Sequence, residues 1–158
     1  MRRFLPWLIL CSILVAANRA PAQTGCGIFR DITIQKYGTG CPGAFLNAPE
    51  LVATLDPGPC ALAIEMKAPT GCCNVYFGGW VLLLGAQKLE VPVLRTGCTL
   101  YVQPLVDVWL PSTVTKVAAP IPQDPALAGT TLYLQGAARY FGFYFGPDLS
   151  QGVAVTFR

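Results

Sequence analysis

The acid–base chemistry open to this chain is set by eight carboxylates and by the absence of histidine. Catalysis near neutral pH most often recruits histidine, so Ser-His and Cys-His nucleophiles and histidine metal sites are excluded together. Beyond the N-terminal segment the serines are Ser112 and Ser150, and neither lies in a Gly-x-Ser-x-Gly turn. No spacing of acids resembles a calcium loop. We therefore expect no metal site and no cofactor.

Two carboxylates could still form the acid pair of a glycoside hydrolase. However, Asp56, Asp124 and Asp148 each adjoin a proline in a turn, where a local side-chain hydrogen bond explains an aspartate. The sequence thus favours a protein that is not an enzyme, and a secreted glycoside hydrolase is the enzymatic alternative. The remaining acids are Asp31, Glu50, Glu65, Glu90 and Asp107.

The first 22 residues have the three parts of an export signal. A basic pair precedes an apolar stretch from Phe4 to Ala17, and small residues occupy positions 20 and 22. This stretch is shorter than the roughly 20 apolar residues of a membrane span, although an uncleaved anchor is the alternative. We predict cleavage after Ala22. Residues 23–158 would then form one domain, secreted or held in the periplasm or at the cell surface, with no membrane span.

Removal of the signal also removes three arginines, which leaves eight basic residues against eight acidic ones. A chain with no net charge and no basic cluster has no electrostatic footprint for nucleic acid or for an acidic membrane surface. Charged residues form 12% of the chain, about half of the roughly 25% that is usual in soluble domains. Because weak charge removes the repulsion that keeps domains apart, self-association is compatible with this composition.

Short runs rich in Val, Leu, Tyr and Phe recur between Gly and Pro clusters, which indicates many short strands. No amphipathic helix of ten or more residues competes with them, because Pro104 and Pro111 interrupt the longest candidate. We therefore predict an all-β fold, a two-layer antiparallel sandwich of jelly-roll type with about nine strands. The expected strands are 28–37, 50–55, 61–67, 75–84, 88–94, 99–103, 113–118, 131–138 and 152–157.

The aromatic run 140–145 alternates most clearly. By the period of two, Phe141, Phe143 and Phe145 share one face, and Tyr140 and Tyr144 share the other. If the phenylalanines face the core, the two tyrosines form an exposed pair, which is the candidate ligand-binding site. The alternative is that both tyrosines pack under a loop or at an interface.

The tryptophans are better explained by core packing. The run 80–84 (Trp-Val-Leu-Leu-Leu) does not alternate, which suits a central strand covered on both faces. Trp109 lies between Val108 and Leu110 and is expected to fill the core rather than to serve as a ligand platform. Tyr76 and Trp80 are secondary candidates for stacking on a sugar.

Two stretches carry a resemblance: Tyr-Gly-Thr-Gly-Cys-Pro-Gly at 37–43 and Pro-Gln-Asp-Pro-Ala-Leu-Ala-Gly-Thr-Thr-Leu-Tyr-Leu-Gln at 122–135. With the Gly-Cys-Thr-Leu turn at 97–100, they resemble uncharacterised secreted bacterial β-sandwich domains over roughly residues 37–157. These are turn motifs, so the resemblance implies fold and export, and it brings no established chemistry. It also implies that Cys41 pairs with Cys98.

Six cysteines remain once Cys11 leaves with the signal, and an even number in an exported chain predicts three disulfides. Beyond the pair implied by the resemblance, Cys26, Cys60, Cys72 and Cys73 allow three pairings. We favour Cys60 with Cys72 or Cys73, because a hairpin of strands 61–67 and 75–84 would bring their outer ends together, and Cys26 would take the remaining partner. A direct bridge between Cys72 and Cys73 is the alternative.

The leading hypothesis is therefore a secreted extracellular or cell-surface module that acts by binding or assembly. Its partner would be an extracellular glycan or another surface protein. The first alternative is a carbohydrate-binding module whose sugars stack on Tyr140 and Tyr144, and the second is the glycoside hydrolase.

Overall fold

The computed structural model describes residues 28–29, 31–41, 47–56, 58–69, 76–93, 97–141 and 148–158. This part of the chain is built from β-strands and one short 3-10 helix, η2, at Pro125–Leu127. The expected all-β class is confirmed. The predicted signal segment lies outside the described residues.

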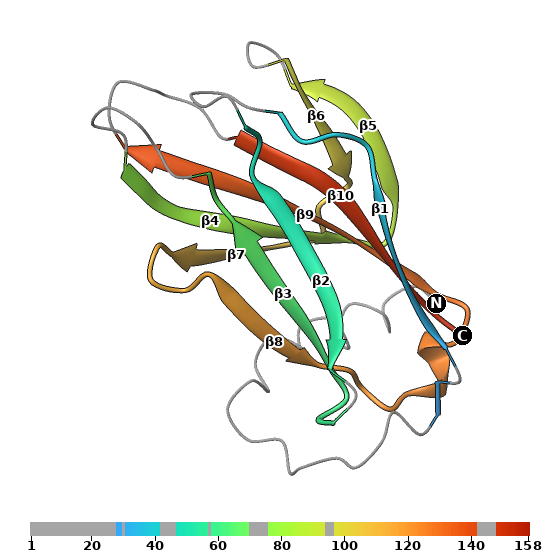
Figure 1. Ribbon diagram of the computed structural model, residues 1–158. Coiled ribbons are helices and arrows are strands. Elements are labelled where there is room, and N and C mark those ends of the chain that lie inside the picture. Colours follow the sequence, from blue (N-terminus) through green and yellow to red (C-terminus); the bar gives the residue numbers. More distant parts are fainter. Residues whose placement is uncertain are drawn as a thin grey trace.

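Within the described residues ten strands form three antiparallel sheets (Figure 1). The five-stranded sheet has the order β1-β10-β9-β4-β7, the three-stranded sheet has the order β2-β3-β8, and β5 and β6 form a separate hairpin. The strands are β1 (Ile32–Tyr37), β2 (Glu50–Asp56), β3 (Ala61–Lys67), β4 (Tyr76–Gly85), β5 (Lys88–Val93), β6 (Cys98–Val102), β7 (Val106–Pro111), β8 (Lys116–Pro120), β9 (Thr131–Phe141) and β10 (Asp148–Phe157).

Each of the nine expected strands has a counterpart in the structure, and β7 is an additional strand that was not expected. In the sequence, Pro104 and Pro111 interrupt the longest helix candidate, and no strand is expected between them. Pro111 is in fact the last residue of β7, which pairs with β4 alone among the described strands. A proline fits there because it cannot donate to a ladder but is tolerated at an edge.

The main core lies between the two larger sheets. Trp80, Leu134 and Val153 of the five-stranded sheet have no exposed surface, and Leu51 and Ile64 of the three-stranded sheet pack against them. Strand β2 faces β10 and lies close to β1 and β9. This arrangement is that of a two-layer sandwich, in which each sheet buries its apolar face against the other.

The β5–β6 hairpin covers part of the outer face of the five-stranded sheet. It is fixed by Gln135 of β9, whose side chain is fully buried. The Gln135 Oε1 accepts a hydrogen bond from the Tyr101 N–H at 2.8 Å. Its Nε2 donates to the carbonyl oxygens of Thr99 at 3.0 Å and Ser150 at 2.9 Å. A buried polar side chain that is satisfied in this way joins β6, β9 and β10 at one point.

A disulfide between Cys41 and Cys98 fastens the same region, as the resemblance implied. Cys41 follows β1 and Cys98 opens β6, so the bridge ties the hairpin to the chain that leaves the five-stranded sheet. The Cys41 N–H also donates to the Leu149 carbonyl oxygen at 2.8 Å. Cys41, Cys98 and Leu149 form a small second core cluster.

The two larger sheets are joined directly where β2 faces β10. A register shift between Leu149 and Gly152 interrupts the pairing of β10 with β9. Gln151 lies in this irregular part, and its Nε2 donates to the Leu51 carbonyl oxygen at 2.8 Å. Its Oε1 accepts from the Leu51 N–H at 3.4 Å. The side chain thus bonds both backbone groups of one residue in the opposite sheet.

Candidate functional site

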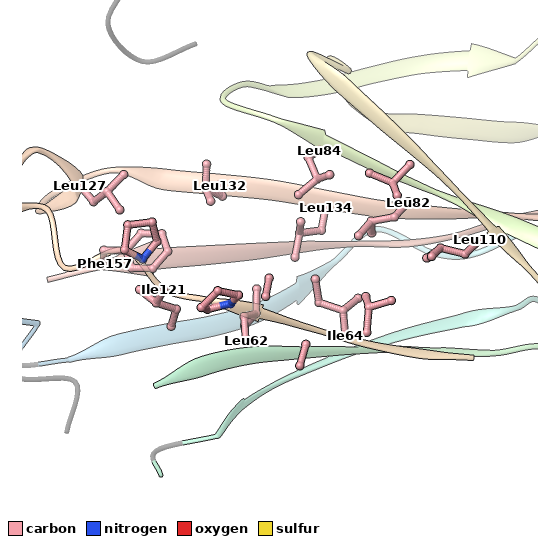
Figure 2. A pocket seen from close by; sticks show the side chains of 16 residues that line it. Leu62, Ile64, Leu82, Leu84, Leu110, Ile121, Leu127, Leu132, Leu134 and Phe157 are labelled. Atoms are coloured by element: carbon pink, nitrogen blue, oxygen red, sulfur yellow. The ribbon is translucent and has the colours of Figure 1, made fainter. Parts of the chain in front are cut away.

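One feature that could receive another molecule is an apolar cleft of about 230 Å³ between the two larger sheets. We call it the β7–β8 cleft, because side chains of both strands line it. In Figure 2 the labelled side chains from the two sheets point toward one another across this space. Its lining residues are Leu62, Ile64, Leu82, Leu84, Val108, Leu110, Val117, Ala118, Ala119, Pro120, Ile121, Pro122, Leu127, Leu132, Leu134 and Phe157.

The sequence places these apolar side chains by simple alternation. On β7, Val108 and Leu110 face the cleft. Asp107, which precedes Val108, and Trp109, which lies between the two, face outward and are exposed. On β8, Val117 and Ala119 are likewise partly buried and line the cleft. The residues that face the cleft from both strands are partly accessible, so the space is open on this side.

The 112–115 loop joins β7 to β8, the two strands that border the cleft. At one end the 112–115 loop is held by two hydrogen bonds, from the Trp80 Nε1 to the Val114 carbonyl oxygen at 2.7 Å and from the Met66 N–H to the Thr115 carbonyl oxygen at 2.8 Å. At the other end Leu127 of the η2 helix packs with Phe157. The cleft is a trough that runs along β8, and its partly accessible side chains lie on β7 and β8.

The cleft exists because the two sheets differ in width. Strands lie about 4.8 Å apart, so five strands span roughly 19 Å and three strands span roughly 10 Å. Because β2 faces β10 and lies near β1 and β9, the smaller sheet covers the half of the larger sheet that is remote from β7. No described strand follows β8 to cover β4 and β7.

Both bordering strands have an edge without a partner among the described strands, since β7 pairs with β4 and β8 pairs with β3. Such an edge presents N–H and C=O groups that can accept another strand. Consecutive residues from Val117 to Pro122 line the cleft, so it follows the backbone of β8 and not only one of its faces. The site therefore combines an apolar cleft with the edge of strand β8.

The prediction that Tyr140 belongs to an exposed pair is wrong. Its side chain is 5% exposed, and its ring packs against Phe77 with a centroid separation of 5.7 Å. Burial raises the pKa of Tyr140, and the charge of Asp148 raises it further. The period of two that begins at Leu132 and Leu134 places Tyr140 on the core face of β9, so the strand itself decides the side chain's direction.

Four other residues of the aromatic interpretation have different outcomes. Tyr144, Phe143 and Phe145 lie outside the described residues. Trp80 has no exposed surface, which confirms the core reading and removes it as a stacking platform for sugars.

Trp109 is exposed, which contradicts the expectation that it fills the core. Its side chain is 48% exposed on the outer face of β7, and the Arg139 guanidinium lies 5.8 Å from its ring centroid. Gly79 of β4 lies close to Trp109. The φ of Gly79 is +139°, and a Cβ atom added to it would lie 2.6 Å from the Leu110 carbonyl oxygen. Among the aromatic side chains that the structure describes, Trp109 is the exposed one.

The β7–β8 cleft is lined by apolar residues. No titratable side chain lines it, so neither an acid–base pair nor a metal ligand is supplied there. In the described part of the chain, no group of three or more Cys, Asp or Glu residues is placed to hold a metal ion. No described helix is long and apolar enough to cross a membrane.

Cys60 is also disulfide-bonded, and its side chain has no exposed surface. The hairpin on which its expected pairing rests does not form, because β3 pairs with β2 and β8 whereas β4 pairs with β7 and β9. Cys26, Cys72 and Cys73 lie outside the described residues.

The sequence holds a signal for one strand that borders the cleft. Val106, Val108 and Leu110 alternate with Asp107 and Trp109, which is the pattern of a half-buried strand. Recognition of that pattern would have supplied β7 and would also have placed Trp109 on the outer face.

Comparisons with known proteins add no relative. No family model, no curated protein and no solved structure matches the chain. The cleft and its surroundings therefore carry the functional argument.

Proposed function

We propose that this chain is an exported, non-enzymatic module that acts by binding or assembly, and that its β7–β8 cleft accepts an extended apolar segment of another polypeptide. The observation that carries the proposal is the trough of about 230 Å³, lined by apolar side chains and open between two strand edges. Export rests on the signal-like first 22 residues.

An extended segment fits this site better than a wholly apolar small molecule. A strand beside β8 would pair with its backbone while projecting every second side chain toward Leu82, Leu84 and Val108. An apolar cavity of about 150 Å³ holds a benzene ring, so 230 Å³ has room for two or three aliphatic side chains. A small hydrocarbon would fill the apolar cleft but would not form hydrogen bonds with the edge of β8.

The proposal is tested with a fluorescent nine-residue peptide of alternating Val and Thr, with blocked ends, titrated into the mature protein. We expect saturable binding, measured by anisotropy, that Val108→Asp weakens at least tenfold, because a carboxylate would enter the apolar trough. Val91→Asp is the matched control, since Val91 is 44% exposed on β5. Peptide binding that is absent, or that both variants leave equal, would refute the assignment of the cleft.

A carbohydrate-binding module is the second candidate, and the exposure of Trp109 favours it. Exposed indole rings stack on sugars, but the Arg139 guanidinium already lies over this ring. A glycan-array screen of wild-type protein and Trp109→Ala distinguishes the candidates. Glycan binding that is lost in Trp109→Ala would support this second function, whereas a blank array supports the cleft.

A further inference from the structure

The backbone groups of β8 point alternately toward β3 and away from it. The Ile121 N–H donates to the Cys60 carbonyl oxygen at 2.9 Å, and the Met66 N–H donates to the Thr115 carbonyl oxygen at 2.8 Å. Both bonds continue the register in which β3 pairs with β8, so the odd-numbered residues of 115–121 are the ones that bond to β3. The even-numbered residues direct their backbone groups toward the opposite edge of β8: Lys116, Ala118 and Pro120.

This edge offers hydrogen-bonding groups to one additional strand. Lys116 and Ala118 are exposed, and each presents both an N–H and a C=O group. Pro120 presents only its carbonyl oxygen, because proline has no N–H. An added strand can therefore form a complete ladder only at the Lys116 end of β8, which suits a short segment.

The same alternation determines which side chains of an added strand enter the cleft. Residues directly opposite each other in an antiparallel pair project to the same face of the sheet. Side chains opposite Val117 and Ala119 would therefore point into the cleft, toward Val108 of β7. Side chains opposite Lys116 and Ala118 would face solvent. The fitting segment has apolar residues at every second position.

Charge adds one more requirement. Lys116 is the charged residue of β8, and its cross-strand neighbour on β3 is Glu65. A carboxylate on the added strand, directly opposite Lys116, would place the lysine between two acids on the solvent face of the sheet. Opposite charges at directly opposed positions stabilise strand pairing. The fitting segment therefore carries an acidic residue at this end.

The sheet edge of a second copy does not fit beside β8. Strand β8 is the outer strand of the three-stranded sheet (Figure 1). Because β2 faces β10, and β3 and β8 follow in the direction of β4, the position beside β8 lies over β7. Two β8 edges that pair antiparallel are related by a two-fold axis perpendicular to the sheet, which puts both five-stranded sheets on the same side. The β7 strands of the two copies would then collide, whereas a lone strand would not meet this obstacle.

We infer that the occupant of the cleft is a single strand of another protein, which pairs antiparallel with the edge formed by Lys116, Ala118 and Pro120. Its residues opposite Val117 and Ala119 are apolar, and an acidic residue lies opposite Lys116. This inference rests on the proposed function and specifies the partner of the same cleft.

Removal of one backbone donor tests the pairing. Ala118→Pro deletes an N–H that points away from β3, and proline is tolerated at such an edge position, so the fold should persist in a urea titration. We expect this variant to bind the alternating Val-Thr peptide about tenfold more weakly or worse, because a hydrogen bond is lost and the proline ring projects toward the added strand. Ala118→Ser keeps the N–H and is the matched control, with affinity within about twofold of the wild type.

The outcomes of this experiment separate the pairing from the assignment of the cleft. If Val108→Asp weakens peptide binding and Ala118→Pro binds as well as Ala118→Ser, the pairing is wrong and the cleft assignment stands. If the wild type does not bind the peptide, both are refuted.

Methylation of the peptide tests the register without any change to the protein. With threonine at the odd positions, the N–H of the central threonine faces β8, and the N–H of the valine after it faces away. N-methylation of that threonine should weaken binding roughly fivefold more than N-methylation of the valine, because only the first removes an intermolecular hydrogen bond. Equal losses would contradict the pairing.

Two isomeric peptides test the charge and the direction of the strand. A glutamate at the seventh of nine positions lies opposite Lys116 when the central threonine lies opposite Ala118, whereas a glutamate at the third position lies opposite Pro120. We expect the seventh-position isomer to bind roughly two- to fivefold more tightly, and Lys116→Gln to abolish this difference. The reverse preference, or a difference that persists in Lys116→Gln, would overturn the antiparallel assignment.

Sedimentation of the mature protein without peptide tests whether a second copy can occupy the edge. We expect the wild type and Ala118→Pro to sediment as the same species at every concentration. A dimer that is present in the wild type and lost in Ala118→Pro would show that two β8 edges pair, and it would overturn the inference.

Discussion

The two lateral sides of the sandwich are held together in different ways. Around β10, polar and covalent contacts join the elements: Gln151 bonds both backbone groups of Leu51, Gln135 joins three strands, and a disulfide secures the hairpin. Between β7 and β8 the cleft is lined by apolar side chains of both sheets, and the Trp80 hydrogen bond to the Val114 carbonyl oxygen lies in the loop that joins the two strands.

This difference separates fixed structure from accessible surface. Directional hydrogen bonds and a crosslink specify one geometry, so the β10 side should tolerate few substitutions. Apolar contacts around an unfilled space are less specific, so the β7–β8 side can repack or accept another chain.

Removing the Cys41–Cys98 bridge should have the largest effect. The bridge closes a chain separation of 57 residues, for which the chain-entropy model gives about 4 kcal/mol of stabilisation. The Cys41→Ser, Cys98→Ser double variant should therefore lose about that much unfolding free energy in a urea titration. A loss below about 1 kcal/mol would show that the hairpin region is not fixed by the bridge.

Gln135→Leu should cost about 3 kcal/mol, because the Tyr101 N–H and the Thr99 and Ser150 carbonyl oxygens would be left buried without the bonds that Gln135 supplies. Gln103→Leu is the control. Gln103 is exposed, so its unfolding free energy should change by less than about 0.5 kcal/mol. Equal urea midpoints for the two variants would show that the Gln135 hydrogen bonds do not stabilise the β10 side.

Enlarging an alanine should affect the two regions with opposite sign. Ala138→Leu adds volume where no surface is exposed and should cost about 1 to 3 kcal/mol by overpacking. Ala119→Leu extends into the open cleft and should be neutral or stabilising by up to about 1 kcal/mol, while it weakens peptide binding. If thermal unfolding shows equal destabilisation by both, the cleft is not open space.

The Lys36–Glu50 ion pair, which joins β1 to β2, should give the smallest effect. The hydrogen bond from Lys36 lowers the pKa of Glu50 below its usual 4.5. The folded protein therefore binds the proton more weakly than the unfolded chain, so this stabilisation is present above pH 4.5 and is lost as the pH falls.

Both side chains of this pair are about half exposed, and solvent screening keeps the contribution under about 1 kcal/mol. Glu50→Gln should slightly flatten the decrease in melting temperature between about pH 5 and pH 3. An unchanged pH profile would mean that the ion pair does not help to hold the β1–β2 edge.

Much of the fold could be predicted from local sequence pattern. Strands such as β3 follow from an apolar run between turn clusters, and all-β architecture follows from their number. The side of the sheet on which an individual side chain lies could be predicted less well. The sequence prediction places Tyr140 outward because it expects the phenylalanines that follow to face the core, whereas the core-facing residues before Tyr140 on β9 decide the register.

The cleft could not be predicted because it depends on which strands pair. Nothing local in the sequence states that β3 and β4 lie in different sheets, or that the three-stranded sheet ends at β8. These pairings arise from contacts between distant segments. The same nonlocal information overturned the hairpin on which the pairing of Cys60 with Cys72 or Cys73 was based.

The most direct test of the open β7–β8 side is an amide chemical-shift titration of ¹⁵N-labelled mature protein with the alternating Val-Thr peptide. We predict that the largest shifts lie along β8 and the inward residues of β7, and that amide exchange at the β8 edge slows as the peptide pairs with it. Shifts confined to the β5–β6 hairpin or to the surroundings of Trp109 would contradict the account.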